Sequence, residues 1–150
     1  MNLFLDTSAI IKIYHNEKGT EKFSKYLSDL SEELFISTSD LTRIELHSAL
    51  LKKFREKRIS KNNLAKVFQL FDKDFQKFNI IAIEEFIKDN AILLLDNLGM
   101  KYSLKTLDSL QLASALYYNS YSKVDYFISA DKKLLNAAKE FFKVINPEEL

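Results

Sequence analysis

The first nine residues constrain the fold of this chain more than any other segment. The apolar run from Leu3 to Leu5 is typical of a buried strand, and Asp6 follows it directly. From Ala9 to Tyr14 the apolar residues change to helical spacing. Because ligands of open α/β sheets bind at the carboxyl ends of the strands, Asp6 is a candidate site residue. The alternative is a local role, since an Asp, Thr or Ser at this point also caps the helix that follows.

Strands and helices alternate along the rest of the chain. The patterns predict strands at 34–37, 80–83, 126–129 and 143–145, and helices at 20–30, 40–57, 60–78, 84–98, 106–118 and 131–142. Gly99 is well placed to end the helix over 84–98. Because helices separate the strands, we expect an α/β fold with a mostly parallel sheet of about five strands and right-handed crossovers. Residues 1–150 are expected to form a single domain.

The composition excludes several kinds of site. There is no cysteine, so disulfides and thiolate metal sites are excluded. With 22 Lys and Arg against 21 Asp and Glu, no net field attracts nucleic acid, and a charged partner must meet a local patch. The N-terminus lacks the pattern of a secretory signal, and the apolar runs are far shorter than a membrane span. We therefore expect a cytoplasmic protein with no membrane partner.

Four acids fall at comparable places relative to these elements: Asp6, Glu45, Asp108 and Asp131. Each has a local explanation, because Asp131 is a plausible helix cap and Asp108 suits the helix dipole. Thr42 and Glu45 fit a capping box. However, Glu45 and Asp108 lie among small and apolar helical neighbours, where a carboxylate is costly to bury without a positive charge. A nearby Lys or Arg could supply it, but a divalent cation serves better, and oxygen ligands favour Mg²⁺ or Mn²⁺ over Zn²⁺.

Four segments resemble, in order and at ordinary spacing, the motifs of PIN-domain proteins of the VapC toxin ribonuclease type. They are residues 6–14, 39–50, 106–115 and 127–134. The resemblance implies a PIN-like α/β/α sandwich and a metal-dependent endoribonuclease. It implies that Mg²⁺ or Mn²⁺ is held by Asp6, Glu45 and Asp108, with Asp131 completing the acidic cluster and Ser8 and Ser129 as supporting hydroxyls. The carboxylates of the first three acids are then expected to lie within several ångströms of one another.

The same resemblance implies three partners. They are an RNA substrate, a cognate VapB-type antitoxin and a second copy of the chain in a homodimer, the last two meeting the helical pair over residues 40–78. An apolar stripe on the second of these helices is either core or interface. It includes Phe68, Phe71, Phe75 and Phe78.

One segment of the chain is strongly basic. Its cations are Lys52, Lys53, Arg55, Lys57 and Arg58. Such a run is commonly a solvated helix end, where Lys and Arg also suit the negative end of the helix dipole. The functional interpretation is a grip on RNA phosphates, since Lys and Arg supply affinity that does not depend on sequence. Both interpretations stay open at this point.

Three other functions compete with the toxin interpretation. An aspartate-nucleophile phosphatase also begins with a strand that ends in Asp, but it needs a second Asp two residues later, where Ser8 stands. A PIN-domain nuclease of RNA processing or decay would act without an antitoxin. A non-catalytic PIN-like binding module usually lacks one of the acids, whereas all four are present here.

Overall fold

A parallel sheet of five strands forms the centre of the structure, a computed structural model that describes residues 1–30 and 33–150. The strands are β1 (Asn2–Leu5), β2 (Phe35–Ser39), β3 (Asn79–Ile81), β4 (Tyr126–Ile128) and β5 (Val144–Ile145). Their order is β3-β2-β1-β4-β5, and every neighbouring pair is parallel. The chain therefore winds outward from β1 in both directions. In such sheets the carboxyl end of the central strand opens into a crevice.

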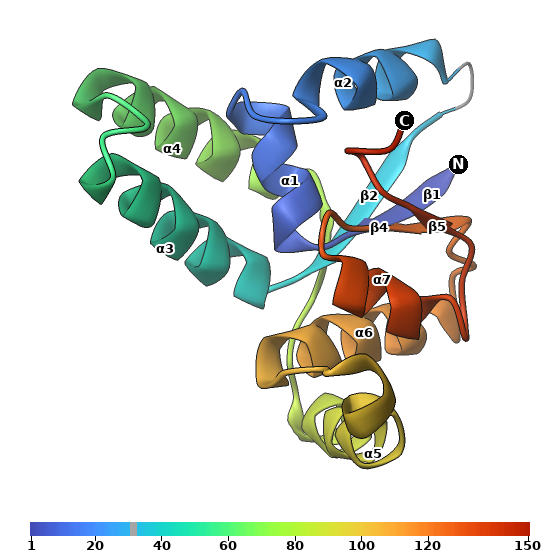
Figure 1. Cartoon of the computed structure of the whole chain (residues 1–150). Coiled ribbons are helices and arrows are strands. Elements are labelled where there is room, and N and C mark those ends of the chain that lie inside the picture. Colours follow the sequence, from blue (N-terminus) through green and yellow to red (C-terminus); the bar gives the residue numbers. More distant parts are fainter. Residues whose placement is uncertain (31–32) are drawn as a thin grey trace.

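Helices cover both faces of this sheet (Figure 1). They are α1 (Thr7–Tyr14), α2 (Thr20–Asp29), α3 (Leu41–Arg55), α4 (Lys61–Phe75), α5 (Glu85–Tyr102), α6 (Thr106–Asn119) and α7 (Lys132–Ala138). In Figure 1, α1 and α2 lie above the sheet, α5 to α7 lie below it, and α3 and α4 form a pair that extends to the left. The predicted α/β/α sandwich is confirmed. Across the part of the chain that the structure describes, every helix is too short or too polar to cross a membrane.

The apolar run in β1 is explained by burial on both faces of the sheet. Phe4 lies in the core beneath α5, α6 and α7, which also contains Leu112, and it stacks on Phe127 with ring centroids 5.5 Å apart. Leu3 and Leu5 point the other way, into the core formed with α1 to α4. Successive side chains of a strand alternate between its faces, so a strand covered on both sides is apolar throughout.

The phenylalanine stripe of α4 belongs to the core. Phe71 is fully buried, while Phe68, Phe75 and Phe78 are partly buried and pack against the same core. Of the two alternatives for this stripe, the structure therefore supports core. The outward side of α4 exposes Leu70 instead.

The prediction that Gly99 ends α5 is wrong. The helix continues to Tyr102, and Ser103 follows it with a left-handed φ of 55°. Glycine commonly takes this conformation at a helix end because it has no Cβ, but here a serine adopts it. Gly99 is therefore an interior helical residue, where glycine is unfavourable.

The variant Gly99→Ala is expected to raise the free energy of unfolding by about 1 kcal/mol, because alanine has the higher helix propensity. No atom lies within 4 Å of the Cβ that it would add. Gly19→Ala is the matched opposite, since Gly19 has a φ of +86° and its new Cβ would lie 2.6 Å from the Pro147 carbonyl oxygen. Urea unfolding of both variants measures the effects, and destabilisation by Gly99→Ala would contradict the helical assignment.

Candidate active site

The four acids singled out in the sequence line one cavity of about 520 Å³. Asp6 directly follows β1, and Asp131 lies three residues beyond the end of β4. Glu45 lies on α3 and Asp108 in the first turn of α6. Residues from four separate segments therefore meet at the carboxyl end of the sheet, at the crevice that the strand order predicts.

Asp6 is buried, and both of its carboxylate oxygens accept hydrogen bonds. Oδ1 accepts from the Ser8 hydroxyl at 2.8 Å and from the Ala9 amide at 3.0 Å, and Oδ2 accepts from the Ser129 hydroxyl at 2.9 Å. The hydrogen bond from the Ala9 amide makes Asp6 the N-cap of α1. Asp6 therefore both caps this helix and lines the cavity. Burial raises the pKa of Asp6 to about 7 despite these hydrogen bonds, and the charge of Glu45 adds to the rise.

Ser8 and Ser129 join the exit of β4 to the exit of β1. The Ser8 oxygen accepts from the Ala130 amide at 2.8 Å, and the Ser129 oxygen accepts from the Asp131 amide at 2.9 Å. Each hydroxyl thus accepts from the backbone after β4 and donates its proton to Asp6. Because both hydroxyls are held in this way, they fix the direction in which the Asp6 carboxylate points.

Glu45 is held by contacts between elements and not by the expected capping box. The N-cap of α3 is Asp40, and the Thr42 hydroxyl bonds at 2.7 Å to a threonine hydroxyl of β2, so the capping-box prediction is wrong. Oε2 of Glu45 accepts instead from the Thr7 hydroxyl and from Nε2 of Gln111, the latter at 2.8 Å. Thr42 is buried against the sheet, which leaves Glu45 free to face the cavity.

Gln111 is a site residue that the sequence analysis missed. It is only 2% exposed, and it lines the cavity from α6. A signal was present in the sequence, since Gln111 is the one amide in a run of small and apolar residues and lies three residues after Asp108, on the same helical face. A polar side chain in such a run must find partners inside the fold.

Asp108 and Asp131 each use one oxygen to cap a helix. Oδ2 of Asp108 accepts from the Lys105 amide at 3.0 Å, and Oδ1 of Asp131 accepts from the Lys133 and Leu134 amides at 2.7 and 3.1 Å. Burial raises the pKa of Asp108, the Lys105 bond opposes this, and the charge of Asp131 adds to the rise. Asp131 is therefore close enough for its charge to act on Asp108.

The acids share a cavity without forming a tight cluster. Across residues 1–30 and 33–150, no three Asp, Glu, His or Cys side chains lie close enough to hold one ion together. The expectation that the carboxylates of Asp6, Glu45 and Asp108 lie within several ångströms of one another therefore stays a prediction. Like charges repel, and each carboxylate turns toward its own local donors.

The donor set nevertheless fits a hard divalent cation. Glu45, Asp108 and Asp131 each keep one carboxylate oxygen to which no described residue donates a hydrogen bond. Every candidate ligand is a carboxylate or hydroxyl oxygen, the kind that Mg²⁺ and Mn²⁺ prefer. Such an ion would also lower the pKa of Asp6 and Asp108, which burial raises and neighbouring carboxylates raise further.

The basic segment divides into residues at the cavity and residues away from it. Lys52 and Arg55 line the cavity. Lys53 is directed to Glu17, with its Nζ 2.6 Å from that carboxylate, and Lys57 lies past the end of α3 with a φ of 58°. Arg58 pairs with Glu56 at 3.4 Å. Of the five cations in this segment, only Lys52 and Arg55 are therefore placed to contact a molecule bound in the cavity.

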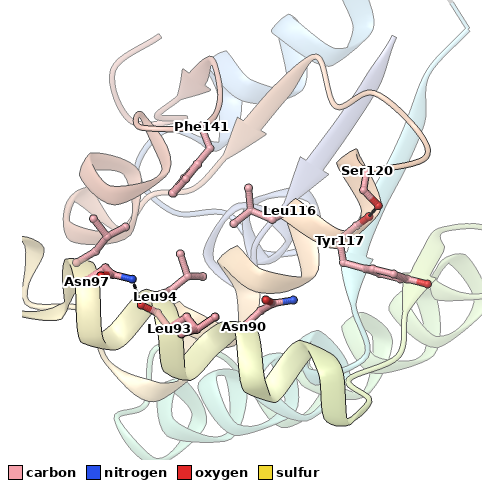
Figure 2. Close-up of a pocket in the computed structure, with 9 residues that line it drawn as sticks. Asn90, Leu93, Leu94, Asn97, Leu116, Tyr117, Ser120 and Phe141 are labelled. Atoms are coloured by element: carbon pink, nitrogen blue, oxygen red, sulfur yellow. Dashed lines mark hydrogen bonds between the residues drawn. The ribbon is translucent and has the colours of Figure 1, made fainter.

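A second cavity, of about 380 Å³, lies between α5 and α6 (Figure 2). Its lining is uncharged and includes Leu94, Leu116 and Phe141. Because no Asp, Glu, His, Lys or Arg lines it, it lacks the charged groups that cation binding or phosphodiester cleavage would need. The cavity with the acids is therefore the candidate active site.

Comparison with known proteins agrees with this architecture. A model of the PIN domain matches residues 3–140. The chain belongs to the PIN-domain family. PIN domains are nucleases that generally use divalent metal ions, so the acids of this PIN domain lie in a cavity suited to that chemistry. No curated protein matches the sequence.

Several solved structures share the fold of this PIN domain. VapBC2 from Rickettsia felis, bound to a DNA fragment from its promoter, is 16% identical with a TM-score of 0.68, over 97% of this chain and 98% of that one. VapBC-1 from nontypeable Haemophilus influenzae is 17% identical with a TM-score of 0.66, over 98% of both chains. A toxin-antitoxin complex from Klebsiella pneumoniae is 19% identical with a TM-score of 0.60, over 97% of both. At these identities the likeness shows the fold alone.

The raised pKa of Asp6 predicts how the stability of the metal-free protein depends on pH. Its folded value of about 7 lies above the ordinary 3.8, so the folded state holds a proton more tightly than the unfolded state. The resulting stabilisation is complete below the ordinary value and is lost as the pH rises through 7. Asp6→Asn cannot ionise, so in EDTA at pH 8 it should melt roughly 5–10 °C above wild type.

The measurement is a series of thermal melts of both proteins between pH 4 and pH 8. The difference should shrink as the pH falls, because wild-type Asp6 becomes protonated. Equal melting temperatures at pH 8 would show that the buried carboxylate carries no such penalty.

Proposed function

We propose that this PIN domain is a Mg²⁺- or Mn²⁺-dependent endoribonuclease. The observation that carries the proposal is the single cavity into which four separate segments bring Asp6, Glu45, Asp108 and Asp131. RNA as the substrate rests on the motif resemblance to VapC-type toxin ribonucleases. The carboxylates are suited to hold a cation, and the cavity is open to solvent at exposed Asp131.

Each residue of the site has a role in this proposal. Asp6, Glu45 and Asp108 hold the cation and Asp131 completes the acidic set, while the hydroxyls of residues 8 and 129 keep Asp6 oriented. When bound, the cation supplies positive charge against the anionic phosphodiester and a water of lowered pKa as the nucleophile. Lys52 and Arg55 are proposed to bind phosphates that flank the scissile bond.

We further propose that the chain is the toxin of a type II VapBC pair, with a VapB-type antitoxin as its partner. VapBC2, VapBC-1 and the toxin-antitoxin complex described above support this by their shared fold. The α3–α4 pair offers a surface for an antitoxin or for a homodimer, because Ile44, Leu51, Phe54 and Leu70 are exposed there. Co-purification with the product of the adjacent reading frame tests the pairing, and its failure would leave a PIN nuclease that acts without an antitoxin.

The variants Glu45→Gln and Asp108→Asn are expected to lower kcat for RNA cleavage by about 100-fold or more, because each removes a ligand charge and keeps the side-chain volume. Asp96→Asn is the matched control, since Asp96 is exposed on α5 and outside the cavity. Cleavage of a fluorogenic RNA at saturating Mg²⁺ measures kcat. Full activity in either site variant would remove that acid from the site.

The two halves of the basic segment are expected to differ in RNA binding. Replacing Lys52 and Arg55 together by Ala should lower the slope of log affinity against log salt by about one unit for each lost phosphate contact. Replacing Lys57 and Arg58 together should change it little, because neither lines the cavity. RNA affinities at several salt concentrations, measured in a Glu45→Gln background to prevent cleavage, give the slopes. If the variant that lacks Lys52 and Arg55 has the same slope as the Glu45→Gln protein, these two cations do not bind RNA phosphates.

A further inference from the structure

Two hydrogen bonds converge on a single oxygen of Glu45. The Thr7 hydroxyl and Nε2 of Gln111 both donate to Oε2, from α1 and α6 respectively. Oε1 accepts from no residue in the described ranges 1–30 and 33–150. One end of the carboxylate is therefore anchored to two neighbouring helices, and the other end is left to the cavity.

The amide of Gln111 has only one orientation that satisfies its surroundings. Its Oε1 accepts from the Ser39 hydroxyl at 3.0 Å, at the end of β2. A serine hydroxyl can donate or accept, whereas a carboxylate oxygen only accepts, so Glu45 requires the NH₂ group on its side and the amide oxygen is left to face Ser39. Nε2 also lies 3.2 Å from the Thr7 and Thr42 hydroxyl oxygens, which gives its second hydrogen a partner. Glu45 thus determines which way Gln111 donates, and Ser39 supplies a donor to the amide oxygen.

We propose that Gln111, together with Thr7, is a positioning residue that holds Glu45 with Oε1 directed at the cation site. The inference rests on the proposed function, in which Glu45 is a ligand. Neutral donors suit this role, because they orient the carboxylate and leave its negative charge for the cation. A Lys or Arg in the same place would instead form an ion pair with the carboxylate, and its positive charge would compete with the cation. Residues that orient a ligand in this way commonly change metal affinity by about 10–100-fold when removed.

The competing explanation is that these bonds only hold α6 against α1 and α3. A purely structural role would lower stability and leave cation affinity unchanged in the protein that remains folded. A positioning role would lower cation affinity in a way that depends on the hydroxyl or amide itself. Measuring the affinity for Mn²⁺ alone therefore separates the two without relying on RNA cleavage.

The experiment compares five variants with wild type. Thr7→Val and Gln111→Met remove the donors at similar size, and Thr7→Ser keeps the hydroxyl. Ser114→Ala is the structural control, because Ser114 is buried on the same helix and donates only to the Leu110 carbonyl, at 2.8 Å. Glu45→Gln removes the charge of the ligand itself. Free Mn²⁺ is titrated by electron paramagnetic resonance, and each variant's melting temperature is recorded without metal.

Thr7→Val and Gln111→Met should weaken Mn²⁺ binding by about 10–100-fold, while Thr7→Ser and Ser114→Ala stay near wild type. Wild-type affinity in both donor-deleted variants, with lowered melting temperatures like that of Ser114→Ala, would overturn the positioning role and leave the proposed function standing. If Gln111→Met does not fold, the contrast between Thr7→Val and Thr7→Ser decides the question. Unchanged Mn²⁺ affinity in Glu45→Gln would instead show that Glu45 is not a ligand, which overturns the positioning role, whereas wild-type protein that binds no Mn²⁺ at all would overturn the proposed metal-dependent function.

Discussion

The structure depends on the burial of one carboxylate, that of Asp6, at the end of its central strand. A buried carboxylate requires donors, and they come from the start of α1 and from the segment after β4. Ser8 and Ser129 supply them while accepting hydrogen bonds from the backbone beyond β4. The exits of β1 and β4 are therefore joined at the place where the other acids lie. Burial raises the pKa of Asp6, so its ionised form is disfavoured when no cation is bound.

Capping and function are compatible in this site. Asp108 and Asp131 each use one oxygen for the amides at the start of a helix, and the other oxygen receives no hydrogen bond from the described residues. A carboxylate has enough acceptor capacity for both tasks. A helix N-terminus also holds the acid at a fixed place and favours its charge. The local explanation of these acids thus accounts for how they are positioned, and it does not argue against a site.

The division of the basic segment follows only in part from helical geometry. Lys52 lies seven residues after Glu45, about 20° away around α3, and Arg55 lies about 80° away in the same direction; all three line the cavity. Lys53 lies about 80° away in the opposite direction and meets Glu17. The angle from Glu45 therefore places Lys52 at the cavity but does not by itself separate Arg55 from Lys53. Whether Lys53 has an acidic partner depends on Glu17, which lies outside α3, so the spacing within α3 does not show it.

The sequence by itself determined the order of strands and helices, the two-sided burial of β1 and the arrival of four acids at one end of the sheet, because residue periodicity and chain order carry this information. Only the tertiary structure decided that Glu45 bonds to Thr7 and Gln111, which lie 38 and 66 residues away. It also decided that α5 continues past Gly99 to Tyr102, with Ser103 at its C-terminal cap. Periodicity tells which face of its own element a side chain occupies. The partner on that face is set by how distant elements pack, so direct contacts and carboxylate orientations were beyond the sequence.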